Sequence, residues 1–289
     1  MPSSVSELLD LLDLESVEDN LFRGAQPRTL LQRVFGGQVA AHALVAASRT
    51  VEQPFVAHSL HSYFLRPGDT AVPIVYDVEN LRDGRSFATR RVVARQHGRP
   101  IYFMTANFQR PEDGLEHQDP MPEVPGPDEC VNLAELFSRR SPRHSEEWER
   151  EWAALEVRWA GDSRPGGRLD PSDHPARQRL WIRTNGSLPD DALTHQAAFT
   201  YASDMTLLGA TLVPHGMHVS SPSMQSASLD HSIWFHRPFR ADHWWLYDQV
   251  SPSASGGRGL AIARVFTQDG LLVASVAQEG LIRVRQTDS

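Results

Sequence analysis

The sequence predicts an α+β protein built from two tandem copies of one small fold. The motif LHSYFLRP at residues 60–67 recurs as DHSIWFHRP at 230–238, and the shared Arg-Pro sets an offset of 171 residues. A longer pattern, in which an arginine-bearing strand, a glycine turn and a second strand follow one another, recurs as residues 87–110 and 260–283. Solenoid units span about 20 to 50 residues, so a repeat of this length indicates a duplicated domain.

The first half has the pattern of helices followed by antiparallel strands. Leucines at helical spacing predict a helix over residues 4–13, and LFRG at 21–24 predicts a short strand. Gly36-Gly37 then opens an alanine-rich segment, residues 38–50, whose small side chains favour a helix packed closely against a sheet. Turn motifs separate the strands that we expect at residues 58–66, 72–81, 86–97 and 100–110.

The second half repeats this order. Strand-like runs at 155–159 and 179–186 precede a predicted helix over residues 195–213, and the repeated strands follow it. Each half is therefore one helix followed by an antiparallel meander. A sheet wrapped around a central helix is the α+β layout of the hotdog fold, so the sequence predicts a double hotdog with two tandem repeats.

Residues 111–150 differ in composition from both halves. The segment RPEDGLEHQDPMPEVPGPDE holds five prolines among many charges, and SRRSPRHSEEWERE is charged throughout. We expect a solvated linker with one short helix here. It separates an N-terminal hotdog domain at 1–110 from a C-terminal domain at 151–289, which carries the candidate catalytic residues.

Composition excludes several classes of function. A net charge of −8 without a basic patch argues against a nucleic-acid partner. No run of about 18 apolar residues predicts a membrane span. The single cysteine, Cys130, excludes a disulfide framework and a cysteine metal cluster. All 28 basic residues are arginine, so no lysine is present for a Schiff base or a Walker-type phosphate loop. We expect no cofactor and no metal.

Asp204 is the first polar residue that the helical pattern places unexpectedly. Apolar side chains repeat at intervals of three and four along residues 195–213, and Asp204 lies on or beside that buried stripe. Burial disfavours the ionised carboxylate unless a partner stabilises it, and it raises the pKa. The pattern alone leaves two interpretations open, a buried cap or ion-pair member and a catalytic carboxylate.

Gln278 and Ser228 are the second and third candidates. Strand alternation puts Gln278 on the face of Ala274 and Val276, where its neighbours are apolar. An ordinary amide at a strand end is the structural alternative. Ser228 lies in a serine-rich strand, so its residue type alone does not indicate a function. The sequence contains no G-x-S-x-G motif that would suggest a serine nucleophile of the α/β-hydrolase type.

Histidine is the usual general base, and 13 are present. His61-Ser62 matches His231-Ser232 by motif. Because these dipeptides occur in both halves, we interpret the histidines as structural, and we do not expect His58 beside them to act as the base. The run DHSIWFH at 230–236 has spaced ligand types, but its intervening residues are typical of a core, so it does not indicate a metal site.

Several long strings resemble the type II acyl-CoA thioesterases. The resemblance covers nearly the whole chain apart from the linker, and its strings are GGQV (36–39), HSLHSYFLRPGD (58–69), VENLRDGRSFATRRV (78–92), WIRTNG (181–186), YASDMTLL (201–208), SLDHSIWFHRPFR (228–240) and TQDGLLVASVAQEGLIR (267–283).

The resemblance implies a double-hotdog enzyme that hydrolyses medium- to long-chain fatty acyl-CoA to free fatty acid and CoA. Its catalytic aspartate, threonine or serine, and glutamine map onto Asp204, Ser228 and Gln278, the three residues singled out above. Asp204 would deprotonate a water that Ser228 and Gln278 hold against the thioester, without a covalent intermediate. In the first half, Asn107 occupies the position that matches Gln278 in the second half. We therefore expect the first half to be catalytically degenerate.

Substrate contacts are expected at the start of a helix and in a glycine-rich turn. Backbone N–H groups near Gly36, Gly37 and Gln38 would stabilise an oxyanion. Arg258 in SGGRG is the candidate phosphate partner, with a solvated turn arginine as the alternative.

Two other functions stay open. One is a non-catalytic acyl-CoA binder, and the other is a hotdog acyl-CoA hydratase, for which no His-Asp or His-Glu dyad is evident in the sequence. Because hotdog sheet edges commonly pair across subunits, we expect a homodimer or tetramer. The sequence ends Gln286-Thr287-Asp288-Ser289 instead of in a Ser-Lys-Leu-like signal, so a cytoplasmic location is expected.

Overall fold

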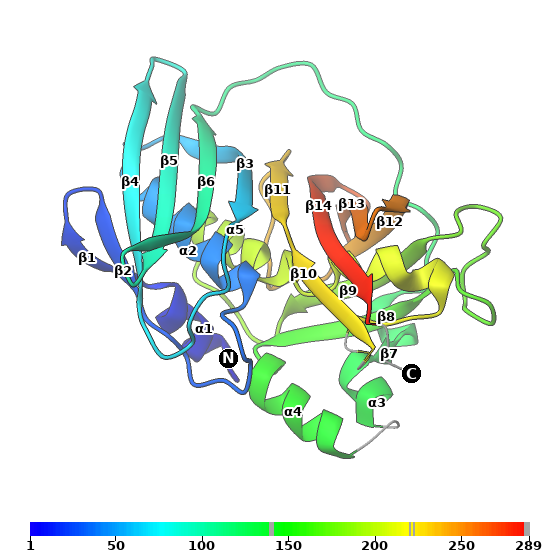
Figure 1. Cartoon of the computed structure of the whole chain (residues 1–289). Coiled ribbons are helices and arrows are strands. Elements are labelled where there is room, and N and C mark those ends of the chain that lie inside the picture. The colour runs from blue at the N-terminus through cyan, green and yellow to red at the C-terminus, as the bar shows by residue number, and fades with distance from the viewer. Residues whose placement is uncertain (139–141, 220, 222, 286–289) are drawn as a thin grey trace.

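The computed structural model describes residues 1–138, 142–219, 221 and 223–285, and it has the predicted double-hotdog architecture (Figure 1). The C-terminal residues Gln286–Ser289, on which the expected absence of a targeting signal depends, lie outside the described residues.

The first half contains two helices and six strands, and its order agrees closely with the prediction from sequence. The elements are α1 (Val5–Leu12), β1 (Glu15–Glu18), β2 (Leu21–Gly24), α2 (Gly36–Ser48), β3 (Val56–Phe64), β4 (Ile74–Asp83), β5 (Phe87–Gln96) and β6 (Arg99–Gln109). Ser4 caps α1 by accepting a hydrogen bond from the Glu7 backbone N–H.

The second half is preceded by four short elements. These are the 3₁₀ helix η1 (Pro127–Glu129), strand β7 (Val131–Asn132) and helices α3 (Leu133–Ser138) and α4 (Pro142–Trp152). The half itself consists of β8 (Leu155–Asp162), β9 (Arg177–Thr184), α5 (Ala192–Ser203), the 3₁₀ helix η2 (Leu207–His215), β10 (Met224–Ser228), β11 (Asp230–Phe235), β12 (Trp245–Ser255), β13 (Arg258–Thr267) and β14 (Leu272–Val284).

All the strands belong to one sheet that crosses from one half into the other. Its order is β1-β2-β4-β5-β6-β3-β11-β14-β13-β12-β9-β8-β7, with β10 paired to β14. The halves join where β3 runs antiparallel to β11, with Leu60 opposite Ile233. The sheet edge that we expected to recruit a second subunit is therefore paired within the chain at this junction, and the outermost strands are the short β1 and β7.

The two central helices pack against each other between the halves of the sheet. Every residue of α2 from Gly37 to Ala47 is buried, and the helix contacts β3 to β6 as well as α5. Alanine dominates this helix, and its small side chains permit the close approach that the sequence predicted.

The predicted continuous helix over residues 195–213 is wrong. Helix α5 ends at Ser203, and after a short turn the chain continues as the 3₁₀ helix η2. The carbonyl groups at this end take partners outside the helix: Tyr247 Oη donates to the Ser203 carbonyl at 2.9 Å, and Gln178 Nε2 donates to the Thr206 carbonyl at 2.8 Å. Periodicity cannot reveal such partners, because they come from distant strands.

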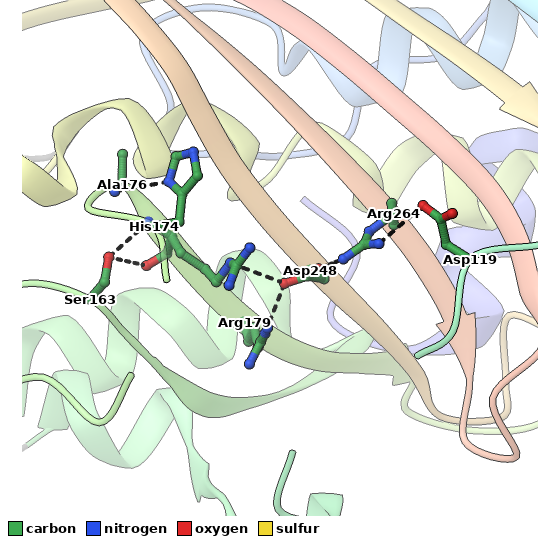
Figure 2. Close-up of polar contacts among 8 residues, drawn as sticks. Asp119, Ser163, His174, Ala176, Arg179, Asp248 and Arg264 are labelled. Atoms are coloured by element: carbon green, nitrogen blue, oxygen red, sulfur yellow. Dashed lines mark hydrogen bonds and ion pairs between the residues drawn. The ribbon is translucent and has the colours of Figure 1, made fainter. Parts of the chain in front are cut away.

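The linker is more structured than expected. Instead of one short helix it contains η1, α3 and α4, and the segment after β6 arches across to the second half before it runs down along it (Figure 1). Asp119 reaches Arg264, which together with Arg179 points at the buried Asp248 (Figure 2). The Pro125 carbonyl accepts a hydrogen bond from Trp181 Nε1 at 2.9 Å. The expected domain boundaries stay a prediction.

No helix in the described ranges is long and apolar enough to cross a membrane.

Candidate active site

The three side chains singled out from sequence meet at one carboxylate oxygen. Gln278 Nε2 donates to Asp204 Oδ1 at 2.5 Å, and Ser228 Oγ donates to the same oxygen at 3.3 Å. They come from three elements of the second half: the C-terminal end of α5, the last residue of β10 and the middle of β14. Contacts across 24 and 74 residues of sequence thus assemble the cluster.

Strand register puts Ser228 and Gln278 on the same face. Ser228 lies opposite Gly280 in the β10–β14 pair, two residues from Gln278 and therefore on its side of the sheet. A Cβ atom at Gly280 would lie only 2.3 Å from a methyl carbon of Leu208 in η2. The missing side chain at Gly280 therefore lets η2 lie close on β14, and this brings the preceding Asp204 to Gln278.

Asp204 also faces the other half of the molecule, at the N-terminal end of α2. A Cβ atom at Gly36 would lie 2.6 Å from Asp204 Oδ2, and one at Gly37 would lie 2.2 Å from the Tyr201 carbonyl oxygen. The Gly37 backbone N–H is a hydrogen-bond partner of Asp204. Asp204 therefore acts as a carboxylate cap on a helix whose own N-cap residue, Phe35, provides no side-chain hydrogen bond.

Burial raises the pKa of Asp204 to about 6, and the hydrogen bonds from Gln278, Ser228 and Gly37 oppose that rise. The carboxyl group is surrounded by protein atoms, although the residue as a whole keeps some solvent-accessible surface. A carboxylate with this pKa is mostly ionised at neutral pH and still basic enough to accept a proton.

A buried network holds Gln278 from behind. Its Nε2 lies 3.2 Å from His231 Nδ1, and His231 Nε2 lies 2.8 Å from Ser203 Oγ, which in turn donates to the Thr200 carbonyl. Gln278 Oε1 is buried and has no hydrogen-bond partner among the described residues. The amide therefore uses its donor side for binding within the protein and leaves its acceptor free.

The predicted equivalence of His61 and His231 is wrong. In the β3–β11 pair His61 lies opposite Ser232, and His231 lies opposite Ser62. His61 is exposed while His231 is fully buried. A one-residue difference in strand register places a side chain on the opposite face of the sheet, so matching letters did not mean matching positions.

The structure does not bring every predicted contact residue to the trio. The Gln38 side chain is buried and turned away, donating to the Ala25 carbonyl at 3.3 Å. Arg258 is exposed, and its Nε donates to Glu279 Oε1 at 3.0 Å. Glu279 follows Gln278 and points to the opposite face of β14.

In the first half, the Asn107 side chain lies beside His58 instead of beside a carboxylate. Burial lowers the pKa of His58, and the neighbouring Asn107 side chain opposes that shift. Asn107 Oδ1 and His58 Nε2 are buried without a hydrogen-bond partner in the part of the chain that the structure describes.

Sequence reasoning missed the residues that position Asp204. Gln249 Nε2 donates to Thr206 Oγ1 at 2.7 Å, and Gln178 bonds both Gln249 and the Thr206 carbonyl, so two buried amides hold the turn after Asp204. The available signal was an amide on a strand face with apolar neighbours, the same signal that identified Gln278. No group of three potential metal-ligating side chains occurs in the described ranges.

The arrangement provides a base, two donors and a helix N-terminus in one place. Ionised Asp204 can accept a proton from a water molecule, and the free Gln278 Oε1 can accept a hydrogen bond from it. The N-terminal end of α2 provides backbone N–H groups and the positive end of the helix dipole, which stabilise developing negative charge.

Comparisons with known proteins match nearly the whole chain. The family model described as acyl-CoA thioesterase matches residues 158–281, and the one described as the acyl-CoA thioesterase N-terminal domain matches residues 26–109. Acyl-CoA thioesterase 2 of Haemophilus influenzae is 41% identical over 98% of this chain and 99% of its own. Human acyl-coenzyme A thioesterase 8 is 40% identical over 95% of this chain and 88% of its own.

Solved structures give the same result. The crystal structure of an acyl-CoA thioesterase II from Mycobacterium marinum is 45% identical and superposes with a TM-score of 0.82 over 98% of this chain and 99% of that chain. A Mycobacterium avium homologue is 32% identical, with a TM-score of 0.79 over 97% of this chain and 100% of that chain.

Proposed function

Because the chain belongs to the type II acyl-CoA thioesterase family, we propose that it hydrolyses medium- to long-chain fatty acyl-CoA with Asp204 as general base. The products are free fatty acid and CoA. The observation that carries the proposal is the convergence of Gln278 and Ser228 on the Asp204 carboxylate, beside the N-terminus of α2.

The proposed reaction is a direct attack of water on the thioester. Asp204 accepts a proton while the water oxygen bonds to the carbonyl carbon, and backbone N–H groups in the first turn of α2 stabilise the oxyanion. Collapse of this intermediate breaks the carbon–sulfur bond, and the proton held by Asp204 passes to the departing CoA sulfur. Ser228 and Gln278 keep the carboxylate and the water in line with the carbonyl.

Arg258 remains the proposed contact for a CoA phosphate. Support comes from its exposed guanidinium beside the Gly256-Gly257 turn, although its partner Leu281 lies on the face of β14 opposite to Gln278. Its pairing with Glu279 means that a phosphate would have to replace or share a carboxylate. A screen of acyl-CoA lengths with wild-type protein and Arg258→Ala tests chain length and this contact together, because loss of a phosphate contact raises KM for every chain length.

Asp204→Asn tests the role of the base. The amide has nearly the same shape and removes a buried charge, so the variant should fold with at least the wild-type Tm at pH 7. Its kcat should fall by roughly 10² to 10⁴. A folded Asp204→Asn protein that keeps more than about a tenth of the wild-type kcat contradicts the proposal.

Incubation with palmitoyl-CoA and a thiol reagent separates hydrolysis from the two alternatives. Release of the CoA thiol at catalytic turnover supports hydrolysis. Bound but unreacted thioester would instead indicate an acyl-CoA binder, and reversible hydration of an enoyl-CoA would indicate a hydratase.

A homodimer or tetramer is proposed as the assembly. Support comes from aromatic rings on the outer face of the sheet where the halves join. The exposed Tyr63 stacks on the half-buried Phe103 with ring centroids 5.5 Å apart, and the ring of the exposed Trp234 lies edge-on to that of His61 with centroids 5.1 Å apart. Light scattering that gives only the 32.3 kDa chain mass at micromolar concentration would contradict it.

A cytoplasmic location is also proposed, on the composition of the chain. Cell fractionation that finds the protein inside a membrane-bound organelle would contradict it.

A further inference from the structure

His231 is a fully buried histidine that touches the proposed site from behind Gln278. It lies in β11, which pairs with β14. In this pair Ser232, the residue after His231, lies opposite Ala277, the residue before Gln278. Its two ring nitrogens both have partners, Gln278 Nε2 at 3.2 Å and Ser203 Oγ at 2.8 Å. Each partner is itself buried.

The charge on Asp204 determines every proton in this network. An ionised carboxylate can only accept, so the group 2.5 Å from Asp204 Oδ1 must be the amino side of the Gln278 amide. That same Nε2 also faces His231 Nδ1, which must therefore be unprotonated and accept its second hydrogen. The ring proton then sits on Nε2 and is donated to Ser203 Oγ, whose own proton goes to the Thr200 carbonyl.

The network is consistent only with a neutral ring. Burial lowers the pKa of His231 to about 3, so the imidazole stays neutral at any pH at which the protein is expected to work. If the Gln278 amide were rotated by half a turn, its carbonyl oxygen would face two acceptors, the lone pair on His231 Nδ1 and the Asp204 carboxylate. A neutral histidine with an unprotonated Nδ1 therefore disfavours this orientation.

We propose that His231 is a positioning residue for the thioesterase reaction: it locks the Gln278 amide with its amino group on Asp204 and its carbonyl oxygen free for the attacking water. The inference rests on the proposed function, since it needs Gln278 to act in catalysis. The hydrogen bond from Gln278 Nε2 to His231 determines the direction in which the unpartnered Gln278 Oε1 points.

The first half offers a matched control. His42 in α2 is also fully buried, and its ring nitrogens contact Tyr76 Oη at 3.0 Å and the Leu11 carbonyl at 2.8 Å. Burial lowers its pKa to about 4. Neither of these hydrogen bonds involves Asp204, Ser228 or Gln278, so His42 shares the burial and hydrogen bonding of His231 without bonding to the trio.

The test compares His231→Phe with His42→Phe. Both remove two hydrogen bonds from a buried ring and should lower Tm similarly. Only His231→Phe should lower kcat, by roughly 5- to 100-fold with KM little changed, because a freed amide spends most of its time in unproductive orientations. His231→Asn, which keeps an acceptor near the Nδ1 position, should recover part of the lost kcat.

The pH profile adds a readout that a purely structural role does not move. Loss of the Gln278 hydrogen bond removes one of the contacts that lower the pKa of Asp204, so the acidic limb of kcat/KM should shift to higher pH in His231→Phe and not in His42→Phe. Among the described residues, the buried Tyr102 and Tyr247 lie close enough to Asp204 to respond to its charge: burial raises both of their pKa values, and the carboxylate raises them further.

A Gln278→Ala background separates this inference from the proposed function. In this background His231→Phe should not lower kcat further, because the Gln278 amide that His231 holds is already absent. If Gln278→Ala alone keeps wild-type kcat, the proposed trio is wrong. If Gln278→Ala is impaired while a folded His231→Phe keeps wild-type kcat, only the positioning role is overturned.

Ser203→Ala decides the question if His231→Phe does not fold. It removes the acceptor of the His231 Nε2 proton but keeps the ring and the Ser203 carbonyl that Tyr247 uses. The positioning role is supported if Ser203→Ala lowers kcat on its own but causes no further loss when it is combined with Gln278→Ala. An unchanged kcat in Ser203→Ala overturns it.

Discussion

Two tyrosines separated by the 171-residue offset show what the two halves share and where they differ. Tyr76 and Tyr247 are both fully buried and both bind the central helix of their own half. Tyr76 Oη lies 3.0 Å from His42 Nδ1, within a helix that continues to Ser48. Tyr247 Oη donates to the carbonyl of Ser203, the last residue of α5.

The difference shows how a duplicated scaffold acquires one candidate reactive position. In the first half, helix α2 continues past the residue that Tyr76 contacts, and that residue is the neutral, buried His42. In the second half the helix has ended, and the next residue is a carboxylate with a raised pKa. The packing contact is common to both halves, whereas the reactive group depends on the helix end.

The candidate site nevertheless needs both halves. Asp204 stands at the end of α5 and caps the start of α2, so the glycines of one half contact the carboxylate of the other. The first half, which is expected to be catalytically degenerate in its own residues, nevertheless provides the helix N-terminus.

The largest effect among the variants below is expected at Gly37, where the halves touch. A Cβ atom there would lie 2.2 Å from the Tyr201 backbone oxygen, so Gly37→Ala must push α2 and α5 apart. We expect kcat to fall by about 10²-fold or more, because a displacement of about 1 Å can cost that much. Gly114→Ala is the control, since a Cβ atom there meets nothing within 4 Å. A Gly37→Ala enzyme with wild-type kcat would mean that the junction is not part of the site.

Gln278→Ala and Asn107→Ala compare equivalent strand positions in the two halves. Gln278→Ala should lower kcat by roughly 10- to 100-fold, because Asp204 loses its shortest hydrogen bond. Asn107→Ala should leave kcat within about twofold, since its neighbour is His58 and not a carboxylate. Steady-state kinetics on one long-chain acyl-CoA checks both, and similar losses in the two variants would refute the assignment of catalysis to the second half.

Ser228 should give the smallest effect. Its hydrogen bond to Asp204 is longer, at 3.3 Å, so Ser228→Ala should cost roughly 3- to 10-fold in kcat. Ser228→Thr keeps the hydroxyl and should be nearly neutral. Ser226→Ala, two residues earlier on the same face and bonded to the Val219 carbonyl, is the control. If the threonine variant loses as much as the alanine variant, the hydroxyl is not the group that matters.

The sequence predicted the fold because hydrophobic periodicity and turn residues are local. The strands of each half followed from alternation between turn residues, and the repeat indicated the duplication. The predicted simple meander is wrong, because β3 pairs with β6 and β11 pairs with β14 instead of with the next strand along the chain. The break in α5 was not predictable in this way, because its causes, Tyr247 and Gln178, lie on strands distant in the sequence.

The trio was found for a related physical reason. Asp204 and Gln278 are polar groups on apolar faces, and such groups need a partner, which each provides for the other. Ser228 carried no such signal and came from the family resemblance alone. His231 was missed because a repeated His-Ser dipeptide suggested equivalence, whereas the face of a strand is set by register.

The pH dependence of kcat/KM tests whether ionised Asp204, at the junction of the halves, is the base. Burial raises its pKa to about 6, and the carboxylate must be deprotonated to act. Activity should therefore rise with pH through a midpoint near 6 and level off above it, and this limb should be absent from the residual activity of Asp204→Asn. A limb near pH 4, as for a solvated aspartate, or an unchanged limb in Asp204→Asn, would contradict the account.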